Sequence, residues 1–340
     1  MKNKHFFAFV FLLYSITFFA QTYITDVTIV DVENQRLVPN QTVVITDDII
    51  TDIQNSSELN IPENAERIDG NGKYLSPGLV DAHIHFFQSG GLYTRPDGIN
   101  FQKYRPYEEE IALAKADMED KLIRYLQNGI TTVIDVGANQ YFLDKRKDFV
   151  YKKYAPRILM SGPLLTTYKP EVYEGLGDWD PFTLTKTIEE GIQGVRDQLQ
   201  HDPDFIKIWY IAGADGLTVA NSALKNLPII KAIINEAHQN GVKVAVHATQ
   251  RITAQLAVQN GADYLVHSID DEIIQDDLVQ LMKKNNTILC PSLIVSDGYS
   301  KTFGQRHNMS THDLQKSNPH QLGTLLDVKH LADTLFTKRL

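Results

Sequence analysis

The chain has 340 residues, of which 43% are hydrophobic and 22% charged, so it is long enough to bury a large core. Its formal net charge of −9 argues against a nucleic-acid-binding surface, which would require clustered Lys and Arg. The single cysteine, Cys290, excludes an internal disulfide and is interpreted as a small core residue.

The first 20 residues have the pattern of a secretory signal. Lys2 and Lys4 precede an uncharged apolar run that is too short to span a bilayer comfortably and ends at Ala20. Phe18 suits cleavage poorly, so an uncleaved anchor is the alternative. We therefore predict an exported protein, periplasmic or secreted, with a signal peptide over residues 1–20 and no other membrane segment.

Residues 21–77 are rich in short β-type runs separated by turn residues. The runs Tyr23–Val32, Thr42–Ile45 and Ile49–Ile53 contain many β-branched residues, with Asp47 and Asp48 between the last two. Such a set of strands is too small to bury two faces by itself. The pattern predicts a partial β-sandwich domain over residues 21–77 that needs partner strands from elsewhere.

From Leu79 onward, apolar strands alternate with helical stretches. The predicted strands are Leu79–His85, Thr131–Val136, Arg157–Ser161, Phe205–Tyr210, Val242–His247, Asp263–His267 and Thr287–Leu293. The predicted helices are Glu108–Gln127, Thr185–Gln200, Ser222–Asn240, Ile252–Gln259, Glu272–Lys284 and, after a polar irregular stretch, Gln321–Leu340. This alternation predicts a parallel sheet covered on both faces, and therefore an α/β fold. We interpret residues 78–340 as a (β/α)8 TIM-type barrel from which the eighth strand is missing.

The sequence Gly-Leu-Val-Asp-Ala-His-Ile-His, residues 78–85, carries the first candidate site. His83 and His85 lie two residues apart on a strand, so their side chains point to the same face. Two such imidazoles can bind one ion at about 2.0–2.1 Å from each nitrogen. The alternative is an ordinary pair of histidines at a strand end.

Further candidates end or interrupt other strands. His247 and His267 each close an apolar strand, and neutral imidazole is a common metal ligand. Lys207 lies inside a buried strand, where desolvation and nearby cations lower the pKa of an ammonium and allow the neutral amine to form a carbamate. A hydrogen-bonded core histidine and a lysine that reaches solvent remain the alternatives.

Taken together, these residues resemble the amidohydrolase superfamily, and in particular its imidazolonepropionase-like and prolidase-like branch. The resemblance extends from Tyr23 onward. It implies that His83 and His85 bind one metal ion, that carboxylated Lys207 bridges to a second, and that His247 and His267 bind the second. The resemblance also implies an aspartate at the end of the eighth strand, which no residue here matches. No acid–base residue is therefore assigned, and we expect this chain to be incomplete as a catalyst.

The resemblance implies hydrolysis of an amide, a cyclic amide or a C-terminal peptide bond by metal-activated water, with one or two divalent ions, zinc being favoured. The expected substrate is a small molecule, peptide-like or N-acylated. One alternative is a mononuclear enzyme of the deaminase or imidazolone hydrolase type. Another is an inactive barrel that only binds a ligand or partner. No nucleic acid or membrane partner is expected, and a homo-oligomer stays open.

Overall fold

The computed structural model describes residues 21–331, which divide into two compact units between Pro77 and Gly78. The signal segment predicted for residues 1–20 lies outside the described residues. Among residues 21–331, none of the helices combines the length and the apolar character that a membrane span requires.

The N-terminal unit, residues 21–77, is built on one sheet in the order β3-β2-β1-β4, with β5 also paired to β1. Its strands are β1 (Gln21–Asp31), β2 (Arg36–Thr46), β3 (Ile49–Asn55), β4 (Glu66–Asp69) and β5 (Tyr74–Leu75). β1, β2 and β3 are antiparallel, whereas β4 and β5 run parallel to β1. The three β-rich runs predicted from the sequence are strands, and within residues 21–77 they form a single layer.

The C-terminal unit contains two parallel sheets. The three-stranded sheet consists of β6 (Leu79–Ile84), β7 (Ile130–Asp135) and β8 (Arg157–Met160). The six-stranded sheet has the order β10-β9-β11-β12-β13-β14, with β9 (Leu164–Thr166), β10 (Phe182–Leu184), β11 (Phe205–Trp209), β12 (Lys243–His247), β13 (Tyr264–Val266) and β14 (Ile288–Cys290). All seven strands predicted from Leu79 onward are present. β9 and β10 were not predicted, because three residues are too few to show a period.

Hydrogen bonds join the two sheets. The amide of Asp204 donates to the carbonyl of Met160 at 3.0 Å, which connects the end of β8 to the start of β11. The hydroxyl of Tyr264 on β13 donates to the carbonyl of Ala82 on β6 at 2.8 Å. The seven predicted strands thus follow one another in space in their order along the chain, as expected for an α/β fold with parallel strands.

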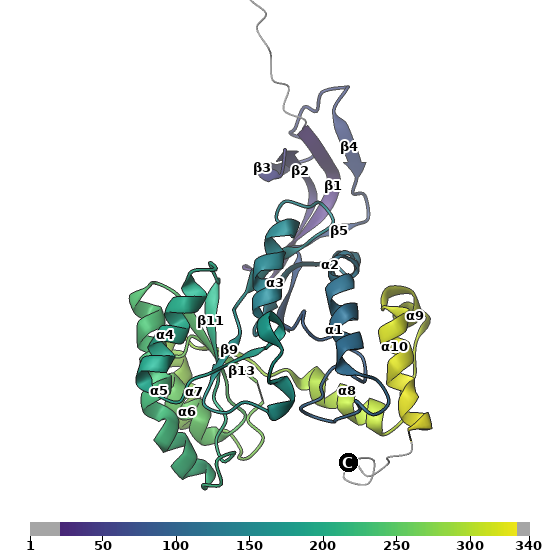
Figure 1. Cartoon of the computed structure of the whole chain (residues 1–340). Coiled ribbons are helices and arrows are strands. Elements are labelled where there is room, and N and C mark those ends of the chain that lie inside the picture. Colours follow the sequence, from purple (N-terminus) through teal and green to yellow (C-terminus); the bar gives the residue numbers. More distant parts are fainter. Residues whose placement is uncertain (1–20, 332–340) are drawn as a thin grey trace, which may run out of the picture. The chain divides into compact units, whose positions relative to one another are not determined.

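Helices cover the outer face of the six-stranded sheet (Figure 1). They are α4 (Ile188–Leu199), α5 (Val219–Gln239), α6 (Arg251–Gln259) and α7 (Asp276–Asn285). Ile206 and Ile208 of β11 and Val244 and Val246 of β12 are fully buried in the core between this sheet and the helices. The residues that alternate with them on the same strands, including Lys207 and His247, therefore point to the opposite face.

The remaining helices correct three predictions. The helix predicted over residues 108–127 is interrupted at Asp117 and forms α1 (Tyr107–Ala116) and α2 (Met118–Gln127). The strand predicted to reach Leu293 ends at Cys290, because Ser292 takes a left-handed conformation with φ 52° and α8 (Leu293–Phe303) begins after it. The predicted C-terminal helix begins earlier and is shorter, since α10 (Pro319–Leu326) ends in a 3-10 turn (Asp327–His330), and residues 332–340 lie outside the described part.

Two short helices were not predicted, α3 (Gln140–Lys145) and α9 (Thr311–Lys316). α9 lies in the stretch interpreted as irregular. Its polar composition gave no helical period, but it begins with a capping box. The Ser310 hydroxyl accepts from the Asp313 amide, and the Asp313 carboxylate accepts from the Ser310 amide. Arg124 of α2 donates to the carbonyls of Lys316 and Ser317, both at 2.9 Å, which holds the segment between α9 and α10 against α2.

Candidate metal centre

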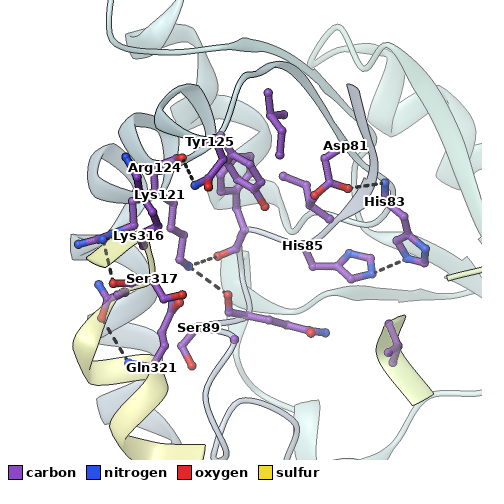
Figure 2. Close-up of a pocket in the computed structure, with 18 of the residues that line it drawn as sticks. Asp81, His83, His85, Ser89, Lys121, Arg124, Tyr125, Lys316, Ser317 and Gln321 are labelled. Carbon is purple, nitrogen blue, oxygen red and sulfur yellow. Dashed lines mark hydrogen bonds between the residues drawn. The ribbon is translucent and has the colours of Figure 1, made fainter. Parts of the chain in front are cut away.

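β6 places His83 and His85 on one face, while Ile84 between them packs into the core with α2 and β7. The Nε2 atoms of the two histidines lie 3.2 Å apart, and both rings line a cavity (Figure 2). The sequence therefore brings these two side chains together as the spacing predicted.

On the far side of each ring, Nδ1 faces an oxygen atom that can accept a hydrogen bond from it. The Nδ1 of His85 is 3.2 Å from the carbonyl oxygen of Gly137, which can only accept, so this nitrogen carries the hydrogen. The Nδ1 of His83 is 2.6 Å from the Ser292 hydroxyl, whose own hydrogen can go to the carbonyl of Cys290 at 3.4 Å. With a hydrogen on both Nδ1 atoms, the two Nε2 atoms would present lone pairs to each other, an arrangement that a cation between them would stabilise.

The other three candidates lie beside this pair. The His267 ring centroid is 4.6 Å from that of His83 and 4.2 Å from that of His247. Lys207 is 1% exposed and lines a cavity of about 90 Å³ together with His85, His247 and His267. All five predicted ligands therefore converge, although they come from β6, β11, β12 and the residues directly after β6 and β13.

The electrostatics of the cluster favour neutral side chains. Burial lowers the pKa of Lys207 from its ordinary 10.5 to about 7, and the charge of Asp135 opposes that shift only in part. Burial, with help from neighbouring cationic groups, also holds the pKa of His83, His247 and His267 well below 6.5. Neutral imidazoles and a neutral amine are the forms that can bind a metal or react with carbon dioxide.

Sequence analysis missed Asp135, which is fully buried at the end of β7. Its carboxylate accepts from the amides of Phe86 at 2.9 Å and Gly137 at 3.2 Å, and lies 3.5 Å from the Nδ1 of His85. Gly137 is needed there, because a Cβ would come within 2.8 Å of Leu164 and 3.1 Å of the His85 ring. The signal was an aspartate closing an otherwise apolar strand.

Replacing Asp135 with Asn should weaken the site, because one oxygen becomes an NH2 group that cannot accept from a backbone amide. We expect the unfolding free energy to fall by about 1–3 kcal/mol. Metal retention should fall about 10–100-fold, as is usual when a group that orients a ligand is lost. Chemical denaturation and elemental analysis measure the two effects. Asp48→Asn, at an exposed turn, is the control, and a D135N variant that matches it in both would contradict a supporting role for Asp135.

The histidine pair also borders a larger cavity of about 520 Å³ (Figure 2). Its wall includes Lys121 of α2, which donates to the carbonyls of Phe86 at 3.3 Å and Gln88 at 3.0 Å. Burial lowers the pKa of Lys121 to about 8. These bonds hold the start of the loop that follows β6 against α2.

Other residues near the site have different surroundings. Asp81 accepts from the His83 amide at 3.3 Å and so contacts the backbone of the site. Trp209 lines the 90 Å³ cavity, whereas Tyr210 is buried and donates to the carbonyl of Ala223 at 2.6 Å. Cys290 is only partly buried. The remaining histidines of the described chain are partly or fully exposed: His201, His238, His307, His312, His320 and His330. Of these, His307 lines a separate cavity of about 550 Å³.

Within residues 21–331, no three His, Cys, Asp or Glu side chains are arranged as a complete set of metal ligands. The donors nevertheless suit a divalent ion. Two ligands about 2.0–2.1 Å from one ion are roughly 3–3.4 Å apart, and the 3.2 Å between the two Nε2 atoms falls in that range.

Comparison with known proteins identifies the family of this chain. Residues 74–313 match the amidohydrolase family, and the chain belongs to it. A dihydroorotase from Bacillus cytotoxicus is 32% identical over 109 residues, which are 28% of this chain and 26% of that protein. The matched segment is thus about a quarter of the dihydroorotase. The resemblance to the superfamily predicted from the sequence is confirmed.

Solved structures share the fold at low sequence identity. A prolidase complexed with N-methylphosphonate-L-proline has a TM-score of 0.65 at 21% identity, over 91% of this chain and 73% of that one. A Xaa-Pro dipeptidase with bound methionine gives 0.65 at 22%, over 87% and 72%. The ochratoxinase of A. niger gives 0.65 at 20%, over 91% and 72%. These structures share the fold of this chain over most of its length.

Proposed function

We propose that this protein is a metal-dependent hydrolase of carbon–nitrogen bonds, with His83 and His85 holding one divalent ion and His247 and His267 a second. The observation that carries the proposal is the 3.2 Å separation of the two Nε2 atoms, beside a buried cluster of His247, His267 and Lys207. A bound divalent ion, for which zinc suits imidazole ligands, would polarise a substrate carbonyl and lower the pKa of water.

In this proposal a carbamate formed on Lys207 is the ligand between the two histidine pairs. With a pKa of about 7, a large share of its side chain is the neutral amine at neutral pH. The nitrogen lone pair adds to the carbon of carbon dioxide and one proton leaves to water, which gives a carbamate anion. This oxygen donor bears one negative charge, so it offsets part of the positive charge that the ions bring into the cavity.

The surrounding groups keep the ligands in place. The Gly137 carbonyl and the Ser292 hydroxyl orient the two rings of β6, and Asp135 holds the backbone on both sides of them. Phe182 and Trp209, with ring centroids 4.6 Å apart, form an apolar wall of the small cavity and limit its water content. The chain's own residues thus position the site and exclude solvent from it.

The substrate we propose is a small amide, peptide-like or N-acylated. The names of the prolidase and the Xaa-Pro dipeptidase support a peptide-like compound. We further propose that the seven parallel strands belong to a (β/α) TIM-type barrel, since they are ordered in space as along the chain. Residues 1–20 support export to the periplasm or the medium.

The test is an activity screen of the purified 340-residue protein over N-acyl amino acids, dipeptides and cyclic amides, with and without added zinc, together with a metal count. We expect slow hydrolysis that depends on zinc, with two ions per chain, because no acid–base residue is assigned. One ion per chain with deamination would favour the mononuclear alternative. Metal-independent hydrolysis, or no hydrolysis with the site loaded, would overturn the proposal.

A further inference from the structure

Arg95 lies in the loop after β6 and lines three cavities. One is the 90 Å³ cavity that it shares with Lys207, His247 and His267. Another is a cavity of about 550 Å³ with a mainly apolar wall, formed by residues that include Leu92, Ile99, Val295, Tyr299 and Phe303. Arg95 therefore stands where the candidate metal centre opens toward an apolar chamber.

Two contacts hold the guanidinium in a fixed orientation. Its Nε donates to Asp97 Oδ1 at 2.8 Å and its Nη2 donates to Asp97 Oδ2 at 2.7 Å. The Tyr173 hydroxyl donates to the same carboxylate at 2.6 Å, and Tyr173 is 1% exposed. The guanidinium of Arg95 is positively charged at neutral pH.

The contacts with Asp97 use only one edge of the guanidinium. A guanidinium has five N–H donors, and the end edge, with one Nη1 and one Nη2 hydrogen, remains for another acceptor. Two parallel donors on one edge match the two oxygens of a carboxylate. The Arg95 side chain keeps 37% of its surface exposed and lines all three cavities, so a ligand in them can reach it.

From this geometry we propose that Arg95 binds the carboxylate of the substrate, and that the substrate is an N-acyl or peptidyl derivative of an amino acid with a bulky apolar side chain. The proposal rests on the hydrolase function proposed above. The scissile amide then lies at the histidines, the carboxylate on Arg95 and the apolar side chain in the 550 Å³ cavity. Asp97 and Tyr173 are positioning residues that hold the guanidinium.

A binding measurement tests the subsite without turnover. The probes are 3-phenylpropanoate and 3-phenylpropanol, which differ in the carboxylate, and calorimetry gives the Kd of each. We expect the wild type to bind the carboxylate about 10–100-fold more tightly, as for a hydrogen bond to a charged group. Arg95→Met should remove that preference and Arg95→Lys should restore part of it. The control is Arg306→Met, an exposed arginine outside the three cavities.

A comparison of kcat/KM for three substrates tests the same subsite during turnover. N-acetyl-L-phenylalanine is compared with N-acetylphenethylamine, which lacks the carboxylate, and with N-acetylglycine, which lacks the apolar group. We expect the first to have the highest kcat/KM, and Arg95→Met to lower kcat/KM for it alone, about 10–100-fold. Equal kcat/KM for the first two compounds in the wild type would overturn the subsite while the hydrolase function stands. If the protein prefers the carboxylate probe through Arg95 but hydrolyses none of the compounds, the subsite is supported and the hydrolase function is overturned.

Discussion

Replacing His83 and His85 together with Ala is expected to abolish tight metal retention and, with it, hydrolysis. The two Nε2 atoms lie 3.2 Å apart and are oriented from behind by Gly137 and Ser292, so the double variant removes a prepared pair of ligands. Loss of two imidazoles from a site of four or five protein ligands removes the geometry a divalent ion needs. We expect the rate to fall by at least about 10²–10⁴-fold.

The matched control is the double variant His312→Ala and His330→Ala, in which two exposed histidines far from β6 in the sequence are removed. Elemental analysis after exhaustive dialysis gives the metal content, and circular dichroism shows that the fold is kept. The assignment of His83 and His85 is wrong if the double variant of β6 retains as much zinc as this control.

The sequence allowed the strands and the five ligand candidates to be predicted, because both depend on local patterns. Apolar runs of four to seven residues mark buried parallel strands, and His83, His85, Lys207, His247 and His267 stand out against those runs. Parallel strands bring their carboxyl ends to one edge, so residues that end separate strands meet there. The structure confirms that these side chains converge, and their role in metal binding stays a prediction.

The supporting residues could not be predicted, because their role depends on contacts between distant segments. Ser292 is 209 positions from His83, and it reaches the ring only through a left-handed turn that periodicity does not show. Arg95 occurs in a loop, and its guanidinium contacts Asp97, which in turn accepts from the distant Tyr173. Asp135 offered a signal, since a carboxylate in an apolar strand must be stabilised by hydrogen bonds, but its partners remained unknown.

Replacing Lys207 with Ala should lower the metal content and the rate of hydrolysis, because the carbamate that we propose between the two histidine pairs cannot form. A short carboxylate, such as formate or acetate, should restore part of both, since it can occupy the space that the side chain leaves. Lys231→Ala, at an exposed position of α5, is the control. Full metal content in the K207A variant without added carboxylate would contradict a bridging role for Lys207.

The same lysine should give the metal-free protein a pH-dependent stability. Its folded-state pKa is about 7, against 10.5 for an unperturbed lysine. Between these two values the unfolded chain binds more protons than the folded one, so the unfolding free energy should rise with pH over this range. Below pH 7 both states are protonated and the full cost of burying the cation is present. Lys207→Met removes that cost and keeps most of the side-chain volume.

We therefore expect the K207M variant to be more stable than the wild type at pH 6, by an amount on the order of a few kcal/mol, with the difference shrinking as pH approaches 10.5. Urea denaturation at several pH values measures it, in buffer with a chelator and without carbon dioxide, so that neither metal nor carbamate contributes. Lys231→Met should follow the wild type at every pH. Parallel curves for the K207M variant and the wild type would mean that Lys207 is solvated or paired in solution, and its neutral amine would then be too scarce to form the carbamate.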